Sequence, residues 1–300
     1  MDISELMFQI CVAFIFAPKV DGQIFPNNSK GLTSVPTGIP LDTVELLLAN
    51  NQLTDITPGF FEGLYKLTIL HLFGNKLSVV PDLSTVGNTL QVLLLQGNQI
   101  TSIPAHVLDS MSALQELNLA SNQLTIINDE DFTGLVSLKN LSLSKNKLTI
   151  VPNLNGVGKT LQKLLLSGNN ITSFLGNSLR NMSALTDLDL ANNHLTILPD
   201  LSNLGRLLTY LHLWDNQISI IPDFHPANPA TLTINAGGNP LDLGACENAW
   251  LKQAVLDGAT VLGVNTSNEC WADAGYQMLQ QQCAANSHIT GKLNMTKLDV

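Results

Sequence analysis

Apolar residues recur along this chain at fixed distances from an asparagine. From residue 43 to residue 240, short stretches follow the pattern L-x-x-L-x-L-x-x-N-x-L, as in LTILHLFGNKL from Leu67 and LQELNLASNQL from Leu114. Alternate residues of a strand point to opposite faces, so each copy predicts a short strand with one buried face. The asparagines of the copies are 23 or 24 residues apart: Asn51, Asn75, Asn98, Asn122, Asn146, Asn169, Asn193, Asn216 and Asn239.

A period of this length with this pattern is that of the leucine-rich repeat. One copy cannot bury its apolar face, whereas stacked copies bury it together. The asparagine side chain can pair backbone groups that the turn after each strand would otherwise leave unpaired. We therefore expect an α/β solenoid: a leucine-rich repeat horseshoe with a parallel β-sheet on its concave side and a small C-terminal cap.

A longer period explains the segment NGVGKT at residues 155–160, whose last three residues resemble the end of a phosphate-binding loop. Residues 76–122 and 147–193 align without a gap at an offset of 71, and 27 of the 47 positions are identical. In this alignment Asn88 takes the place of Lys159, which a phosphate loop could not accept. The segment is predicted to connect two strands on the convex side, and nucleotide binding is not expected.

The first 22 residues are expected to form a secretory signal peptide. Leu6 to Ala17 is a twelve-residue apolar block, too short to cross roughly 30 Å of hydrocarbon, and Val20 and Gly22 offer small residues for cleavage. The alternative is an N-terminal strand or helix packed on the first repeat. No later stretch resembles a transmembrane helix. We expect an exported protein without a membrane span.

Composition narrows the choice of partners. Apolar residues make up 45% of the chain, and 24 acidic residues outnumber 14 basic ones, so the formal net charge is −10. An acidic surface repels phosphate backbones, and neither nucleic acid nor a membrane surface is an expected partner. Glycosylation sequons fit an exported chain, and the candidates are Asn27, Asn140, Asn170, Asn181, Asn265 and Asn294.

The ends of the repeat region resemble known caps. GLTSVPTGIPLDT from Gly31 resembles the N-terminal cap of extracellular leucine-rich repeat proteins, and NPLDLGACENAWLKQAVLDG, followed by Cys270 and Cys283, resembles their cysteine-flanked C-terminal cap. Together with the repeats, they are similar to lamprey variable lymphocyte receptors, Slit and Toll ectodomains and small matrix proteins. The resemblance implies an N-terminal cap at 23–42, nine repeats at 43–240, a C-terminal cap at 241–285 and a tail at 286–300.

The cysteines follow this family only in part. Three of them lie near the C-terminus, which predicts one disulfide bridge and one free thiol. By resemblance Cys246 pairs with Cys283, and pairing with Cys270 is the alternative. The cysteines that the family carries in its N-terminal cap are absent from QIFPNNSK.

Partners of such a fold usually meet the variable residues of the concave strands. Tyr210, His212 and Trp214 alternate on one strand, and Asp187 and Asp189 occupy the matching positions one strand earlier, about 4.8 Å away. Exposed aromatics among polar groups are typical of interface hot spots. These five residues form the first predicted ligand-binding site.

A second candidate is an apolar patch near the N-terminal end of the concave face. His71, Phe73 and Leu94 are its predicted ligand-binding residues. The apolar side chains of the patch are Leu47, Ile69, Phe73, Val92 and Leu94. For both sites the alternative is that the side chains only pack on their neighbours along the sheet.

Catalysis is not expected, since no nucleophile occupies the position next to Asp189 and His212 that a catalytic triad requires. The same residues lack the spacing of a zinc or calcium site, so neither a metal nor a cofactor is expected. A glycan on Asn140 would cover the middle of the concave face and confine a partner to its two ends.

The leading functional hypothesis is therefore a secreted, non-enzymatic module for recognition or adhesion that binds a protein or glycan ligand on its concave face. The alternative is a structural matrix protein that self-associates, for example as a homodimer.

Overall fold

The computed structural model describes residues 22–154, 156–176, 178–204, 206–242 and 248–264. The chain forms two compact units, Met1–Ser142 and Leu143–Val300, and each is described by itself. The signal-peptide residues before Gly22, the cysteines Cys246, Cys270 and Cys283, and the sequons Asn265 and Asn294 lie outside the described residues.

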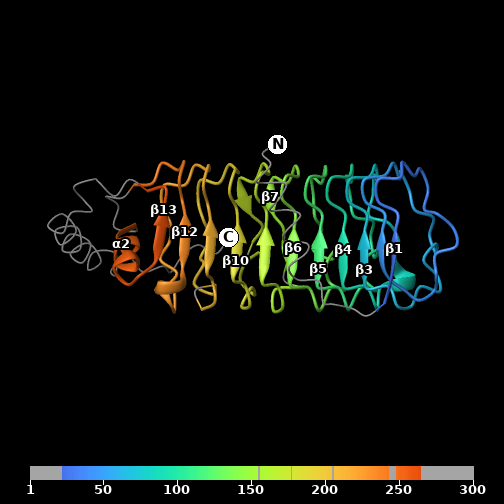
Figure 1. The fold of residues 1–300 in the computed structure, drawn as a ribbon. Coiled ribbons are helices and arrows are strands. Elements are labelled where there is room, and N and C mark those ends of the chain that lie inside the picture. Colours follow the sequence, from blue (N-terminus) through green and yellow to red (C-terminus); the bar gives the residue numbers. More distant parts are fainter. Residues whose placement is uncertain (1–21, 155, 177, 205, 243–247, 265–300) are drawn as a thin grey trace, which may run out of the picture. The chain divides into compact units, whose positions relative to one another are not determined.

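The first unit is a stack of coils, each of which contributes one short strand to a parallel sheet (Figure 1). Residues 84–86 form a single 3₁₀ turn between two strands. Each strand pairs in parallel with the next one along the chain. The strands are β1 (Gln23–Pro26), β2 (Thr43–Leu47), β3 (Ile69–His71), β4 (Val92–Leu94), β5 (Glu116–Asn118) and β6 (Asn140–Ser142).

The second unit repeats this arrangement and ends in a cap. Its sheet has the parallel order β8-β10-β11-β12-β13, and helix α2 (Ala249–Leu256) precedes the last strand. A two-stranded ladder of β7 (Ile150–Val151) and β9 (Ser173–Phe174) lies outside this sheet, and residues 229–231 form a 3₁₀ turn. The sheet strands are β8 (Lys163–Leu165), β10 (Asp187–Asp189), β11 (Tyr210–His212), β12 (Thr233–Asn235) and β13 (Thr260–Leu262).

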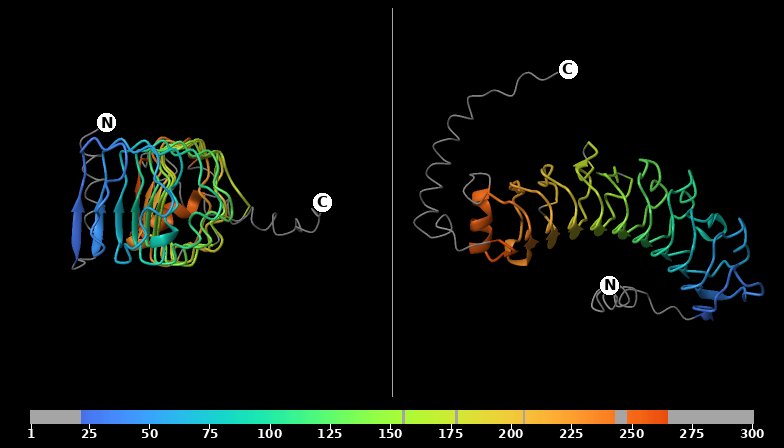
Figure 2. Two further views of the ribbon diagram at one scale, coloured as in Figure 1. Left: turned by 90° about the vertical axis from the view of Figure 1, so that its right-hand side faces the viewer. Right: turned by 90° about the horizontal axis from the view of Figure 1, so that it is seen from above.

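The predicted fold class is confirmed in its elements: repeating coils and a parallel sheet along one side of them in each unit (Figure 2). The cap segments also contribute strands, because β1 pairs with β2 and β13 pairs with β12. One face of each sheet is packed on the core, and the central residue of each repeat strand is at most 1% exposed. The opposite face carries the variable residues and is called the sheet face below.

The repeat asparagines hold neighbouring coils together by bonding to the backbone. Asn216 is 6% exposed, and its Oδ1 accepts a hydrogen bond from the Leu195 N–H at 3.0 Å. Its Nδ2 donates to the carbonyls of Leu190 and Leu213, both at 2.9 Å. One side chain therefore satisfies a buried donor and two buried acceptors that the turns leave without a ladder partner. The same contacts recur at Asn51, Asn75, Asn98, Asn122, Asn169, Asn193 and Asn239, and Asn146 donates to two carbonyls of its own turn.

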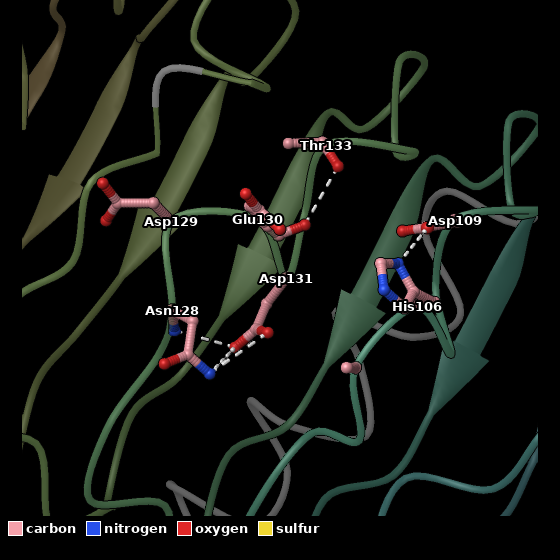
Figure 3. Close-up of a pocket in the computed structure, with 8 residues that line it drawn as sticks. His106, Asp109, Asn128, Asp129, Glu130, Asp131 and Thr133 are labelled. Carbon is pink, nitrogen blue, oxygen red and sulfur yellow. Dashed lines mark hydrogen bonds and ion pairs between the residues drawn. The ribbon is translucent and has the colours of Figure 1, made fainter.

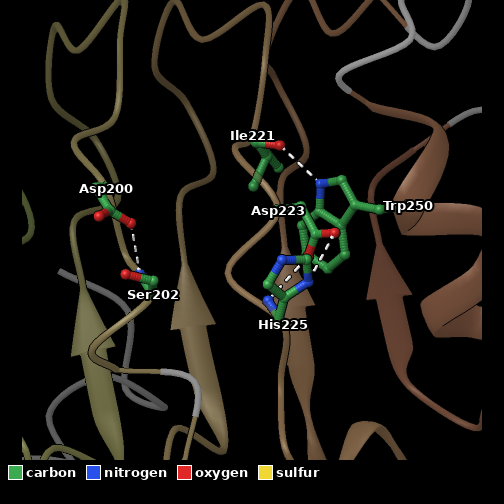
Figure 4. Close-up of polar contacts among 6 residues, drawn as sticks. All are labelled: Asp200, Ser202, Ile221, Asp223, His225 and Trp250. Atoms are coloured by element: carbon green, nitrogen blue, oxygen red, sulfur yellow. Dashed lines mark hydrogen bonds and ion pairs between the residues drawn. The ribbon is translucent and has the colours of Figure 1, made fainter. Parts of the chain in front are cut away.

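An asparagine of the C-terminal cap extends this pattern beyond the repeats. Asn248 is 2% exposed and accepts from the Ile221 N–H at 2.9 Å. It donates to the carbonyls of Ser219 and Asp242. The next aromatic residue, Trp250, donates from Nε1 to the Ile221 carbonyl at 2.8 Å (Figure 4). Its ring also packs edge-on against Phe224. The cap thus covers the last repeat with both polar and apolar contacts.

Two short turns on the far side of the coils are held by carboxylates. Asp200 Oδ1 accepts from the Ser202 N–H at 2.8 Å, which lowers the pKa of that carboxyl, and Asp223 Oδ1 accepts from the His225 N–H at 2.8 Å (Figure 4). Both are turns in which an aspartate replaces a backbone acceptor.

The second glycine of NGVGKT, Gly158, has a packing role. A Cβ atom at Gly158 would lie 2.9 Å from the Asn181 carbonyl oxygen, so only glycine fits between the two coils. Gly87, its counterpart 71 residues earlier, faces Ser110 in the same way. The motif thus serves the contact between coils, as the repeat alignment indicated.

Candidate ligand-binding face

Strand β11 and the two residues that follow it present aromatic side chains on the sheet face of the second unit. Leu211 and Leu213 are fully buried, whereas Tyr210 is 48% and Trp214 37% exposed. The rings of Tyr210 and His212 stack with their centroids 6.1 Å apart and an interplanar angle of 9°. The predicted alternation agrees with the burial of residues 210–214, but the strand itself ends at His212, so the prediction that Trp214 lies on it is wrong.

Charged residues occupy the two strands before β11. Asp187 is in register with Tyr210, and Asp189 with His212. On the next strand Lys163 is in register with Asp187, and its Nζ lies 3.9 Å from Asp187 Oδ2. Lys163 was not among the predicted site residues, although it lies one repeat before Asp187 in the sequence.

The two aspartates differ in their surroundings. Asp189 Oδ1 accepts a hydrogen bond from the Ala191 N–H at 3.0 Å, so this carboxylate also stabilises its own strand. Asp187 Oδ1 is buried and, within the described part of the chain, has no hydrogen-bond partner. Burial raises the pKa of Asp187, the charges of Lys163 and His212 lower it, and Asp189 raises it further. Asp187 is thus the less well compensated charge of the pair.

Small residues flank Trp214 on both sides. The Trp214 carbonyl accepts a hydrogen bond from the Asn192 N–H of the preceding coil. The N–H of the next residue, Asp215, donates to the Gly237 carbonyl of the following coil. Trp214 therefore lies between Ala191 and Gly237 of its two neighbouring coils. Neither residue has a side chain longer than a methyl group. These two small residues leave the indole partly exposed between the coils.

The apolar patch of the first unit is smaller than expected. Ile69 and Leu94 are 5% and 1% exposed, so the prediction that their side chains are available to a partner is wrong. Each lies between residues of two adjacent strands, Leu94 between His71 and Asn118, and neighbouring side chains on a sheet face pack on one another. Leu47, Phe73 and Val92 remain half-buried on the sheet face.

His71 belongs to the same region and is neutral at physiological pH. Its ring centroid lies 5.9 Å from that of Phe73, and its Nε2 lies 3.6 Å from Glu45 Oε1. Burial lowers the pKa of His71 to about 4 and raises that of Glu45. The region is therefore largely an apolar, packed surface, in contrast to the aromatic and charged surface of the second unit.

Comparison with known proteins agrees with this architecture. Two family profiles match the chain: "Leucine rich repeat" at residues 43–86 and 88–148, and "Leucine Rich Repeat" at residues 160–182 and 184–204. The matched segments lie on the coils whose asparagines bond to the backbone. The chain is a leucine-rich repeat protein.

Its curated relatives match over short segments. The leucine-rich repeats and immunoglobulin-like domains protein 1 of Homo sapiens is 36% identical over 74 residues, which is 25% of this chain and 7% of that protein. Keratocan of Danio rerio is 38% identical over 76 residues, 24% of this chain and 22% of that protein. The chain thus spans less than a quarter of the length of these two relatives.

A solved structure supports the fold over most of the chain. The match is to a chain of an octameric complex of latrophilin 3, Unc5D and FLRT2, in which FLRT2 is present as its leucine-rich repeat part. The TM-score is 0.59 at 24% identity, with 83% of this chain and 93% of that chain covered. The resemblance to lamprey receptors, Slit and Toll ectodomains stays a prediction.

The glycosylation sites of this leucine-rich repeat protein also stay predictions. Asn170 and Asn181 are exposed, and Asn140 is half-buried on β6.

Among the described residues, no helix is both long and apolar enough to cross a membrane.

A second cluster of acidic residues lines a pocket on the loops of the first unit (Figure 3). Asp109 Oδ2 lies 2.8 Å from His106 Nδ1, and Asp131 accepts from the Asn128 N–H at 2.8 Å. These carboxylates are already bonded within their own loops. In the part of the chain that the structure describes, no group of three histidine, cysteine, aspartate or glutamate residues could hold a metal ion.

Replacing Asp187 with asparagine is expected to stabilise the fold at pH 7. The folded-state pKa of this acid is raised, so the folded protein binds the proton more tightly than the unfolded chain, and the ionised carboxylate opposes folding at neutral pH. We expect Asp187→Asn to raise the free energy of unfolding by roughly 1 kcal/mol or less, because the carboxylate is only partly buried and solvent screens its charge.

Urea denaturation at several pH values measures this effect. Because the cost of the charge vanishes as Asp187 is protonated, the gain from Asp187→Asn should shrink as the pH falls toward the ordinary pKa of an aspartate. A variant less stable than the parent at pH 7 would mean that the Lys163 contact outweighs the cost of burial.

Proposed function

We propose that this chain is a secreted, non-enzymatic recognition module that binds a protein or glycan ligand on the sheet face of its second unit. The observation that carries the proposal is the exposure of Tyr210 on β11 and of Trp214 two residues after that strand, with the charged side chains of Asp187 and Lys163 on the two preceding strands. Large aromatic side chains next to polar groups are the composition of binding hot spots.

The sheet holds these residues in place before a ligand binds. Tyr210 and His212 belong to a strand that is hydrogen-bonded in parallel to β10 and β12, and the ring of Tyr210 already stacks on His212. A surface whose side chains are held before binding loses less conformational entropy when a ligand arrives. This rigidity supports recognition, as does the occurrence of the similar repeat of FLRT2 within a multi-protein complex.

Secretion is proposed on the apolar block from Leu6 to Ala17 and on the sequons. The non-enzymatic role is proposed because Asp189 does not hydrogen-bond to His212 in the described structure and bonds to the Ala191 N–H instead. A carboxylate that orients a catalytic histidine would have to bond to its ring.

Site-specific photo-crosslinking tests where the ligand binds. A benzophenone amino acid would replace Asn235, which is in register with His212, and in a second variant Ile197, which is 75% exposed outside the sheet. The purified full chain would be irradiated on cells or in body fluid that contain its ligand.

We expect an adduct from position 235 and none from position 197. An adduct from position 197 alone would contradict a ligand site on the sheet face. An adduct between two copies of this chain would instead favour a self-associating structural protein.

A further inference from the structure

The negative charge of Asp187, beside strand β11, is only partly compensated by neighbouring groups of the described structure. Asp187 and Asp189 lie on the same strand, and the ammonium group of Lys163 on the adjacent strand lies near Asp187. Asp189 has a backbone donor at 3.0 Å, whereas the ammonium group of Lys163 lies 3.9 Å from Asp187 Oδ2, beyond hydrogen-bond distance. The second oxygen of Asp187 is buried and has no hydrogen-bond partner among the described residues.

An aromatic face lies beside this carboxylate. Tyr210 is in register with Asp187 on the adjacent strand, so the two side chains start about 4.8 Å apart. One face of the Tyr210 ring is stacked on His212, and nearly half of the residue is exposed. A ligand group that meets both residues must have a flat surface for the ring and donors for the carboxylate.

We propose that this site, if it is the ligand site proposed above, binds an arginine side chain of a protein partner. The guanidinium group stacks on the exposed face of Tyr210 and donates to Asp187 Oδ2, the oxygen of this carboxylate that is not enclosed, while Trp214 contacts the neighbouring part of the partner. Guanidinium combines a planar surface with several donors, and it stacks on aromatic rings more readily than ammonium does. Its hydrogen bonds to carboxylates are among the stronger ones in proteins.

Lys163 is expected to compete with the arginine for Asp187. Its ammonium group lies near the same carboxylate that the arginine would bind, and its side chain is 39% exposed. The two cations therefore compete for Asp187, and the loss of Lys163 should strengthen the binding of arginine. A sugar or an acidic ligand would use the Lys163 ammonium as a donor, so the loss of Lys163 should weaken their binding. The sign of the Lys163 effect thus separates these ligand classes.

The experiment is an NMR titration of the full, ¹⁵N-labelled chain with small probes. The probes are N-acetyl-arginine amide, N-acetyl-citrulline amide, which has the same shape without the charge, and a panel of methyl glycosides. The reporter is the indole N–H signal of Trp214, identified by its absence from Trp214→Phe. Trp250, whose N–H is bonded to the Ile221 carbonyl, is the internal reference.

We expect arginine amide to shift the Trp214 signal and to bind about tenfold more tightly than citrulline amide, the ratio that one charge-assisted hydrogen bond produces. Asp187→Asn should weaken arginine binding by about tenfold, and Lys163→Met should strengthen it by about threefold. Asp200→Asn, which removes an exposed carboxylate outside the sheet, should leave it unchanged.

Two results would overturn the inference while leaving the proposed function in place. These are equal binding of the arginine and citrulline probes, and a Trp214 shift caused by glycosides that Lys163→Met weakens. If no probe shifts Trp214 and the crosslinker at position 235 captures no partner, the proposed function itself fails.

Discussion

Replacing Asn216 with alanine is expected to lower the free energy of unfolding by about 3–5 kcal/mol, which would be among the largest effects of a single side chain in this protein. The change removes the hydrogen bonds to the Leu195 N–H and to the Leu190 and Leu213 carbonyls. These three groups are enclosed between coils, and a buried polar group without a partner costs about 1–3 kcal/mol.

The adjacent residue is a matched control. Gln217 is exposed, and its backbone N–H, which an alanine would retain, bonds to the Leu195 carbonyl. Gln217→Ala is expected to change stability by less than about 0.5 kcal/mol. Equilibrium urea denaturation monitored by circular dichroism measures both variants. Similar losses for the two would show that the asparagine contacts do not stabilise the stack.

The second large effect is expected on binding. The double variant Tyr210→Ala/Trp214→Ala should weaken ligand binding by about 100-fold or more, because each truncation at a hot spot typically costs at least about 2 kcal/mol. Both side chains point away from the core, where Leu211 and Leu213 provide the packing. The thermal midpoint of the variant should therefore stay close to that of the parent.

A control variant of the same kind is Tyr65→Ala/Ile197→Ala, which removes two large side chains that are 68% and 75% exposed outside the sheets. Surface plasmon resonance against the crosslinked partner, once purified, gives the affinity of each variant. Equal affinities of the two double variants would remove Tyr210 and Trp214 from the binding site, whereas loss of folding in the first would show that they have a structural role.

The repeat could be predicted because its information is local. The spacing of the asparagines defines the coil, and the alternation around Leu211 places Tyr210 and His212 on the same face without knowledge of any distant residue. The pairing of Lys163 with Asp187 also follows from the repeat, since equivalent residues of successive coils lie in register.

Other features depend on contacts that the repeat pattern does not contain. The burial of Leu94 depends on what surrounds it, including the side chains at His71 and Asn118. Asn248 has the same role as the repeat asparagines but comes only nine residues after Asn239, outside the repeat period. The unpartnered oxygen of Asp187 likewise arises from side-chain positions in three dimensions.

The most direct test of the sheet face as the ligand site compares two tryptophans in one experiment. The crosslinked partner, produced in pure form, would be titrated into the ¹⁵N-labelled chain while the indole N–H signals are followed. We expect the signal of Trp214 to shift or broaden on binding and that of Trp250 to stay in place. A shift of Trp250 with an unchanged Trp214 would locate the ligand at the C-terminal cap and contradict a recognition surface on strand β11.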